Sequence, residues 1–353
     1  MRKVTKSTLA ATVIASSVLL SGCGLFSVEK KVDKIDPPQD VTMDKSTDKE
    51  AQEVSKNTDG KDAVTDTVKR DLFLIDENGW VVPQTVELPN DPAAARQVLE
   101  YLVAGGPVDE ILPDGFRAVI PQDTEVDVKL EGSTLVVDFS KEFGTYEPED
   151  EAKILQAITW TLTQFDTIEN VELQVNGYKL DAMPVNQTPI SESLSRADGI
   201  NLDNSDVVDI TNTRQVTLYF YVENNDSKYY VPITKRIDNS EKDNIAAVVN
   251  ALIKGPKLTS NLLNGIHPDA ELLGATYKDG LVTLDFNEAI FGSFDEKVVS
   301  KHVINSLVLS LTEQPGIESV AITVDGNADI TSEDGKKLSE PVTRPVNVNI
   351  GSF

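Results

Sequence analysis

Cysteine and histidine are nearly absent from this chain, which has one cysteine and two histidines among its 353 residues. A single cysteine, Cys23, cannot form a disulfide within the chain or build a cysteine-based zinc site. His267 and His302 are too few for a metal centre made of several imidazoles. The sequence also lacks a Walker phosphate loop, a dinucleotide-binding fingerprint and a Gly-x-Ser-x-Gly elbow. We therefore expect no metal, no cofactor and no catalytic residue, and predict that the chain is not an enzyme.

Basic residues are also scarce relative to acidic ones. The chain has 32 lysines and arginines against 58 aspartates and glutamates, for a formal net charge of -26. A chain of this charge repels the phosphate backbone, so nucleic acid is excluded as a partner. The 40% hydrophobic and 25% charged residues are an ordinary globular balance, and the length suits roughly two domains.

Long hydrophobic runs are missing as well, since no stretch reaches the roughly 20 apolar residues of a membrane-spanning helix. The apolar stretch Leu9–Leu20 is shorter and follows the positive residues Arg2, Lys3 and Lys6. Residues 1–23 therefore read as a secretory signal peptide. The stretch ends in Leu-Ser-Gly-Cys, which resembles the bacterial lipobox, so Cys23 is predicted to be lipidated rather than to be a buried thiol. Acyl chains on Cys23 would hold the protein to the cell membrane on its extracytoplasmic face.

Residues 24–69 are rich in lysine, aspartate, glutamate, threonine and serine, with no aromatic residue after Phe26. Such a segment buries too little apolar surface to offset its ordering entropy. We interpret it as a disordered acidic linker between the membrane and the folded part; a docking tail is the alternative.

The rest of the chain repeats itself in collinear order. Val82-Pro83 recurs as Val231-Pro232, and Gly106-Pro107 recurs as Gly255-Pro256. Ser191-Glu192 with Arg196 recurs as Ser339-Glu340 with Arg344. The predicted copies are residues 70–202 and 214–353, joined by the connection 203–213.

Hydrophobic periodicity predicts the same elements in each copy. Copy one opens with a hairpin around Asn78-Gly79, whose residues suit a type I′ turn. A helix begins at Asp91-Pro92 and ends at Gly105, as its counterpart ends at Gly255. Two alternating strands, a second helix that begins amid acidic residues, and a last strand follow. The prediction is α+β: each copy has a three-stranded antiparallel or mixed sheet, two helices on its apolar face and an extra N-terminal hairpin.

At these residues the pattern resembles the GerMN domain family, over essentially both copies. The resemblance rests on the lipobox, the tandem copies and the Ser-Glu-x-x-x-Arg ends together. It implies a small α+β fold similar to the ring-building domains of secretion systems. It also implies that the chain belongs to a transenvelope complex between mother cell and forespore, located in the intermembrane space of the engulfed forespore, and contributes to later germination. The expected partners are the proteins of that channel complex.

Asp138 and Asp285 occupy matching strand positions, and nearby carboxylates recur with them: Asp123 and Glu125, then Asp269 and Glu271. Such a set is typical of general acid and base pairs in hydrolases. The favoured interpretation is a solvated sheet face whose carboxylates bind backbone donors. A peptidoglycan-binding or peptidoglycan-modifying protein of the spore envelope stays the alternative function.

Five residues are predicted as candidates for interaction. Arg196 and Arg344 match between copies and either grip a partner's carboxylate or tie each copy's end to its body, as Asn201 and Asn349 would. Copy two also carries extra tyrosines on its hairpin: Tyr219, Tyr221, Tyr229 and Tyr230. An open tyrosine face would stack on glycan rings or bury against another protein, whereas a covered one would pack between the two copies. The candidates are Tyr219, Tyr221, Tyr229, Arg196 and Arg344.

Overall fold

The chain repeats one order of elements in its two copies, and the computed structural model describes residues 66–350 apart from 206–209, 224–227, 241–242 and 292–296. The predictions for residues 1–23, for lipidated Cys23 and for nearly all of the linker 24–69 lie outside these described residues. All of the described residues belong to one compact unit.

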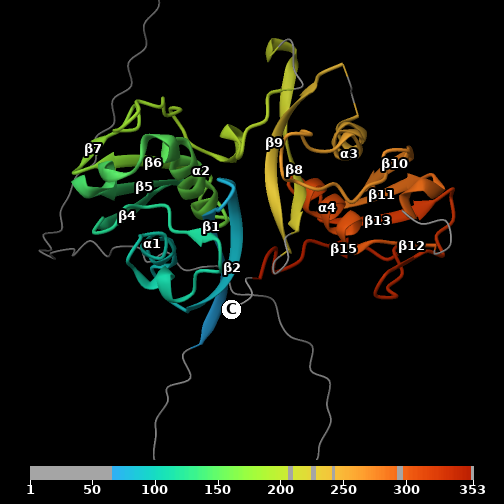
Figure 1. Cartoon of the computed structure of the whole chain (residues 1–353), viewed down its shortest axis with the longest axis horizontal. Helices are drawn as coiled ribbons and strands as arrows, with labels where there is room; N and C mark the ends of the chain where they lie inside the picture. The colour runs from blue at the N-terminus through green and yellow to red at the C-terminus, as the bar shows by residue number, and fades with distance from the viewer. Residues whose placement is uncertain (1–65, 206–209, 224–227, 241–242, 292–296, 351–353) are drawn as a thin grey trace, which may run out of the picture. The chain divides into compact units, whose positions relative to one another are not determined.

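Copy one begins with two long strands and continues with short strands around two helices (Figure 1). Its elements are β1 (Thr67–Asp76), β2 (Val81–Pro89), α1 (Ala94–Glu100), β3 (Phe116–Arg117), β4 (Val126–Glu131), β5 (Thr134–Phe139), α2 (Glu151–Leu162), β6 (Asn170–Val175) and β7 (Tyr178–Lys179).

Copy two follows the same order, except that its described residues form no counterpart of β3 and include two further short strands. Its elements are β8 (Thr213–Glu223), β9 (Lys228–Asp238), α3 (Asn244–Lys254), β10 (Leu272–Lys278), β11 (Leu281–Phe286), β12 (Val298–Val299), α4 (Lys301–Leu311), β13 (Ser319–Val324), β14 (Thr331–Ser332) and β15 (Val342–Thr343).

The main sheet of each copy is mixed, which is one of the two expected forms. In copy one the strand order is β4-β5-β6-β7, with β5 and β6 parallel and the other pairs antiparallel. Copy two has the order β10-β11-β13-β15 with the same strand directions, but β15 pairs with the start of β13, whereas β7 pairs with the end of β6. The predicted count of three strands is one short, because β7 and β15 have two residues each and leave no periodic pattern to read.

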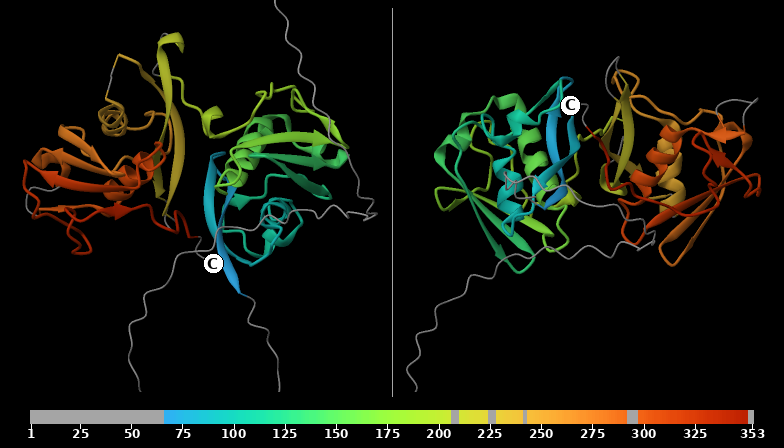
Figure 2. Two further views of the ribbon diagram at one scale, coloured as in Figure 1. Left: turned by 180° about the vertical axis from the view of Figure 1, so that it is seen from behind. Right: turned by 90° about the horizontal axis from the view of Figure 1, so that it is seen from below.

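The helices of each copy lie between its hairpin and its main sheet (Figure 1, Figure 2). In copy one α2 contacts β1 and β2 on one side and β6 on the other. The alternation of β5 buries Leu135, Val137 and Phe139 toward the helices. Thr161 of α2 accepts a hydrogen bond from the Phe73 backbone N–H (3.0 Å), as Ser310 of α4 does from Tyr219 (2.8 Å). These buried hydroxyls fasten each hairpin to its second helix.

The first helix of copy one is shorter than expected. It begins at Ala94, because Pro92 and Ala93 form a turn in which the Asp91 carboxylate accepts a hydrogen bond from the Ala93 N–H (2.7 Å). It ends at Glu100, five residues before Gly105. In copy two the expected end is correct, since α3 stops at Lys254 and Gly255 follows with φ 82°.

The hairpin turn of copy one is not type I′. That turn needs positive φ at both central residues, but only Gly79 has one (84°) and Asn78 does not. The Asp76 carboxylate instead accepts hydrogen bonds from the backbone N–H groups of Asn78 (3.0 Å) and Trp80 (2.7 Å). The result is a three-residue loop that ends in a left-handed glycine.

Glu151 is a buried carboxylate at the start of α2, 1% exposed, and it organises the loop after β7. Its oxygens accept hydrogen bonds from the backbone N–H groups of Val185 (3.0 Å), Asn186 (2.6 Å) and Thr188 (2.8 Å) and from the Tyr146 hydroxyl (2.8 Å). Burial alone would raise the pKa of Glu151, but these donors outweigh it and lower the pKa to about 2.

We predict that Glu151→Gln destabilises the chain by about 2 to 3 kcal/mol near neutral pH, because an amide cannot accept all four bonds. The folded pKa lies below the unfolded one, so the stabilisation is complete above about pH 4.5 and is lost as the pH falls toward 2. Urea titrations across this range measure the difference between wild type and variant. A difference that stays constant from pH 7 to pH 2 would contradict the assignment.

Candidate functional site

The two hairpins meet where copy one contacts copy two: β2 packs against β9. The chain segment that follows each copy's matching arginine runs onto the hairpin of the other copy. Ile200 accepts a hydrogen bond from the Thr234 backbone N–H (2.8 Å), and Asn349 accepts one from that of Thr85 (2.8 Å). The two tails, residues 199–203 and 347–350, are thus exchanged between the copies.

Two asparagines in these tails each bind both hairpins. The Asn201 amide exchanges hydrogen bonds with the Val81 backbone (2.9 and 2.7 Å) and donates to the Pro232 carbonyl (2.8 Å). The Asn349 amide does the same with the Tyr230 backbone (2.7 and 2.9 Å) and the Pro83 carbonyl (2.7 Å). Both side chains are buried. Because Pro83 and Pro232 match, the contact has an approximate twofold symmetry within one chain.

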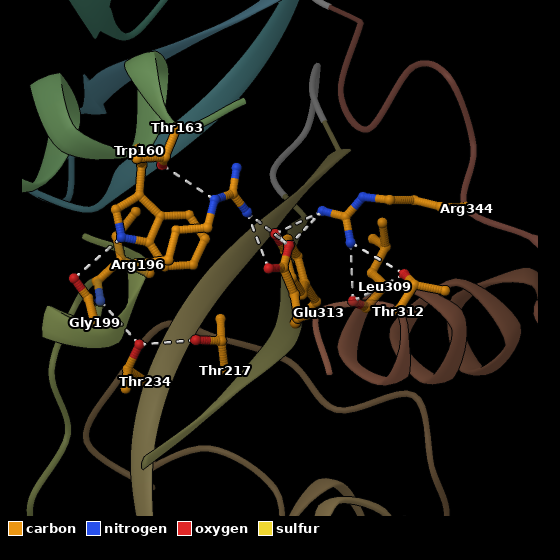
Figure 3. A network of polar contacts seen from close by, with 12 residues as sticks. Trp160, Thr163, Arg196, Gly199, Thr217, Thr234, Leu309, Thr312, Glu313 and Arg344 are labelled. Carbon is orange, nitrogen blue, oxygen red and sulfur yellow. Dashed lines mark hydrogen bonds and ion pairs between the residues drawn. The ribbon is translucent and has the colours of Figure 1, made fainter. Parts of the chain in front are cut away.

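The matching arginines converge on one carboxylate, Glu313, which follows α4 (Figure 3). Arg196 reaches it from copy one at 3.0 Å and Arg344 from copy two at 2.7 Å. The Glu313 side chain is 9% exposed, while those of Arg196 and Arg344 are 34% and 31% exposed. We call these three residues the arginine cluster.

Aromatic rings and helix ends position the two arginines. The Arg196 guanidinium lies over the Trp160 ring, 4.5 Å from its centroid, and donates to Thr163 (3.2 Å). The Arg344 guanidinium lies over the Tyr219 ring at 5.2 Å and donates to the Leu309 carbonyl (3.1 Å) at the end of α4. Each arginine therefore fastens its own copy's second helix, and Arg196 also joins the two copies.

The charges in this cluster determine its protonation. Burial alone would raise the pKa of Glu313, but Arg196, Arg344 and the Tyr219 hydroxyl lower it by more, so the pKa lies below its usual range. Burial also raises the pKa of Asp71, a carboxyl group of β1 outside the cluster. The hydrogen bond from the Thr85 hydroxyl and the charges of the two arginines offset this rise only in part. Burial also raises the pKa of Tyr219, whose hydroxyl donates to Glu313 (2.8 Å). The cluster is thus an anion held by two cations at neutral pH.

The four tyrosines of copy two lie in or beside this contact. Tyr219 is fully buried, and Tyr229 is buried with its hydroxyl donating to Asp76 of copy one (2.7 Å). Tyr230 is buried, and burial raises its pKa to about 12. Tyr221 is half-buried and stacks on His302, with 4.2 Å between the ring centroids. Tyr229 thus bonds to copy one, whereas the hydroxyl of Tyr219 bonds to Glu313 within copy two. Contact of the five candidates with another molecule stays a prediction.

In each copy the strand aspartate of the repeated carboxylates binds a backbone N–H group. Asp138 accepts a hydrogen bond from the Gly177 N–H (2.8 Å), and Asp285 accepts the matching one from Gly326 (2.9 Å). Each aspartate thereby holds the turn after its neighbouring parallel strand. In copy one Glu125 and Asp138 line the same open groove of about 760 Å³. Among the described residues, no group of three or more His, Cys, Asp or Glu side chains is placed to hold a metal ion.

Glu313 is a residue of the candidate site that the sequence analysis did not identify. It aligns with Gln164 of copy one, since both follow a matching threonine, Thr163 or Thr312, after the second helix. Gln164 binds the backbone of Asp71 through its amide oxygen and nitrogen (3.0 and 2.8 Å). Glu313 instead pairs with the guanidinium groups of Arg196 and Arg344. The replacement of a glutamine by an acidic residue at one of two matching positions is a sequence signal that could have identified Glu313.

We predict that Glu313→Gln lowers the free energy of unfolding by roughly 2 kcal/mol, because it leaves two guanidinium groups side by side without their anion. This loss of free energy is smaller than the loss on breaking a fully buried ion pair, because the side chains of both arginines are about one-third exposed. Urea titration at pH 7 measures it.

The control is Glu288→Gln, which removes one partner of the exposed pair with Lys297. It should change the free energy of unfolding by less than about 0.5 kcal/mol. Equal effects of the two substitutions would show that the arginine cluster contributes no more than a surface ion pair.

Comparison with known proteins shows which proteins are similar to this chain in sequence and fold. The sequence matches the model of the Germane family, described as sporulation and spore germination, over residues 71–181 and 217–329. It is 52% identical to the spore germination protein GerM of Bacillus subtilis (strain 168) over 367 residues, which cover 100% of both chains. A solved structure, the tandem GerMN domains of the sporulation protein GerM from Bacillus subtilis, is 54% identical and has a TM-score of 0.77. The match covers 81% of this chain and 100% of that one.

These findings confirm the α+β class, the tandem copies and the resemblance to the GerMN family. No helix among the described residues is long and apolar enough to cross a membrane. The chain is a homologue of GerM and belongs to the Germane family of sporulation and spore germination.

Proposed function

We propose that this chain is a non-enzymatic lipoprotein, held on the extracytoplasmic face of the cell membrane by lipidated Cys23, that scaffolds a transenvelope complex between mother cell and forespore. The observation that carries the proposal is the exchange of tails, which joins two copies of one domain into a single unit. Such a unit presents two related surfaces at a set spacing, which suits a protein that assembles other proteins. The full-length similarity to GerM supports a role in sporulation and later germination.

The chain would be organised as a signal peptide (1–23), an acidic linker (24–69), two domains (70–202 and 214–353) and a connection (203–213). The matched family segments, 71–181 and 217–329, fall inside the two proposed domains. The linker would set how far from the membrane the folded unit works.

We predict that Cys23→Ala releases the protein from the membrane fraction of sporulating cells, because the acyl chains supply the anchor. Immunoblots of membrane and soluble fractions measure the distribution. Ser27→Ala, four residues further along, is the matched control and should leave the protein with the membrane. Retention of the Cys23→Ala protein in membranes would contradict the anchor.

Crosslinking tests the scaffold itself. The tagged chain is purified from sporulating cells after crosslinking, with untagged cells as the control and mass spectrometry as the readout. Enrichment of channel-complex proteins is the expected result. Recovery of wall fragments or wall enzymes alone would contradict the scaffold and favour the peptidoglycan-binding alternative.

A further inference from the structure

His302, in the first turn of α4, faces the hairpin of copy two. Its ring stacks on Tyr221 of β8, with 4.2 Å between the ring centroids, and its Nδ1 lies 3.2 Å from the Tyr230 hydroxyl of β9. The side-chain amide of Asn305, three residues further along α4, donates to the same hydroxyl (3.0 Å). The beginning of α4 therefore holds the hairpin largely through one tyrosine hydroxyl.

This hydroxyl determines which protonation state of His302 fits. Burial raises the pKa values of Tyr221 and Tyr230, that of Tyr230 to about 12, so both tyrosines keep their protons. The oxygen of Tyr230 already accepts the hydrogen bond from Asn305. Among the described residues, His302 Nδ1 is the other group within hydrogen-bonding distance, so the hydroxyl donates its proton to Nδ1. His302 is then a neutral ring that carries its own proton on Nε2, because a protonated ring has no lone pair for the hydroxyl.

The charges around His302 favour the same neutral ring. Burial and the positive charge of Lys228 lower the pKa of His302 below its ordinary value of 6.5, and Lys301 acts in the same direction. The carboxylates of Glu223 and Glu333 act against this fall without cancelling it. A cation in the first turn of α4 would also meet the positive end of the helix dipole.

Tyr230 is at the same time the residue that holds the copy-two tail. Its backbone N–H donates to Asn349 Oδ1 (2.7 Å), and its carbonyl accepts from Asn349 Nδ2 (2.9 Å). Its ring packs in one buried cluster with Val348 of the tail, Tyr219 and Leu309. Any shift of the Tyr230 side chain therefore disturbs both the hydrogen bonds and the packing of the tail.

Copy one has the tail contact without the titratable group. Val81 takes the place of Tyr230 before the matching Val-Pro pair, and Lys153 takes the place of His302, ten residues before the matching threonine that follows each second helix. The Val81 N–H donates to Asn201 Oδ1 (2.9 Å), as its counterpart in copy two does to the other tail. A valine offers no hydroxyl, and a lysine, unlike a histidine, does not ordinarily change its charge between pH 5 and pH 8.

We propose that His302 makes the contact between the copies sensitive to pH: when Nδ1 takes up a proton, the Tyr230 hydroxyl loses its acceptor and the copy-two tail opens more often from the hairpins. The pKa of His302 in the closed state lies below the pKa of a free histidine, so the open state binds the proton more tightly. The stabilisation is complete well above pH 6.5 and is lost as the pH falls through that value. The copy-one tail stays closed over the same range.

Hydrogen exchange and NMR on the full chain, purified in detergent, test this between pH 8 and pH 5. The chain has two histidines, so it gives two Cε1–H signals, and the exposed His267 is the internal reference. The protection factor of the Tyr230 amide, corrected for the intrinsic pH dependence of exchange, reports on the copy-two tail. That of the Val81 amide reports on the copy-one tail and is the matched control.

We expect the His302 signal to titrate with a midpoint below pH 6.5. The Tyr230 protection factor should fall at least about threefold from pH 7.5 to pH 5.5, the effect of roughly half a pKa unit, while that of Val81 stays constant. His302→Gln, whose amide oxygen accepts the hydroxyl but does not titrate, should remove the pH dependence, and His267→Gln should leave it unchanged. The curves of the unmodified chain decide the matter if His302→Gln does not fold.

Three results would overturn the proposal: a His302 midpoint at or above pH 6.5, the same pH dependence at Tyr230 and Val81, or a pH dependence that persists in His302→Gln. The last would assign the effect to another group, such as Asp71, whose carboxylate accepts a hydrogen bond from the tail-binding Thr85 (2.6 Å). Each of these results would leave the scaffold standing, because crosslinking tests it independently.

Discussion

The exchange of tails between the two copies is the contact on which the arrangement of the rest depends. Each tail leaves its own copy, and its backbone and asparagine bind the hairpin of the other, so the hydrogen bonds of Asn201 and Asn349 require both copies to be in place. An amide that makes three hydrogen bonds in a buried site cannot exchange them for water without loss of free energy. The relative placement of the copies is thereby coupled to the satisfaction of buried polar groups, which is more specific than apolar packing alone.

The arginine cluster adds charge to this contact. A carboxylate that binds one guanidinium from each copy neutralises both while remaining an anion, and the rings of Trp160 and Tyr219 cover the guanidinium faces. Copy one uses Gln164 at the matching place, where a second anion would have no arginine left to pair with. The twofold pattern is broken at this charged position and, among others, at Lys235, which matches Val86 of copy one.

Much of each copy follows from local pattern, and the parts that do not follow from it are the non-local ones. The strands around Val137 and Val282 alternate between buried and partly exposed residues, and the helices show apolar stripes, so their existence and the α+β class were predictable. The predicted type I′ turn at Asn78-Gly79 was wrong, because hydrogen bonds to the Asp76 side chain, rather than the turn residues alone, set the geometry of the loop. The path of each tail onto the other copy's hairpin has no periodic signal at all. Lysine usually occupies an exposed strand position, so the burial of Lys235 in β9 could not be predicted from the sequence either.

The central claim is that the crossed tails hold the two copies in one arrangement, and a distance measurement between the copies tests it most directly. Spin labels at Lys129→Cys on β4 and Lys278→Cys on β10, both exposed, report the separation by double electron–electron resonance after Cys23→Ala removes the native thiol. The account predicts one narrow distance distribution, which broadens when Asn201→Ala and Asn349→Ala are combined. A broad distribution in the parent protein, or an unchanged narrow one in the double variant, would contradict it.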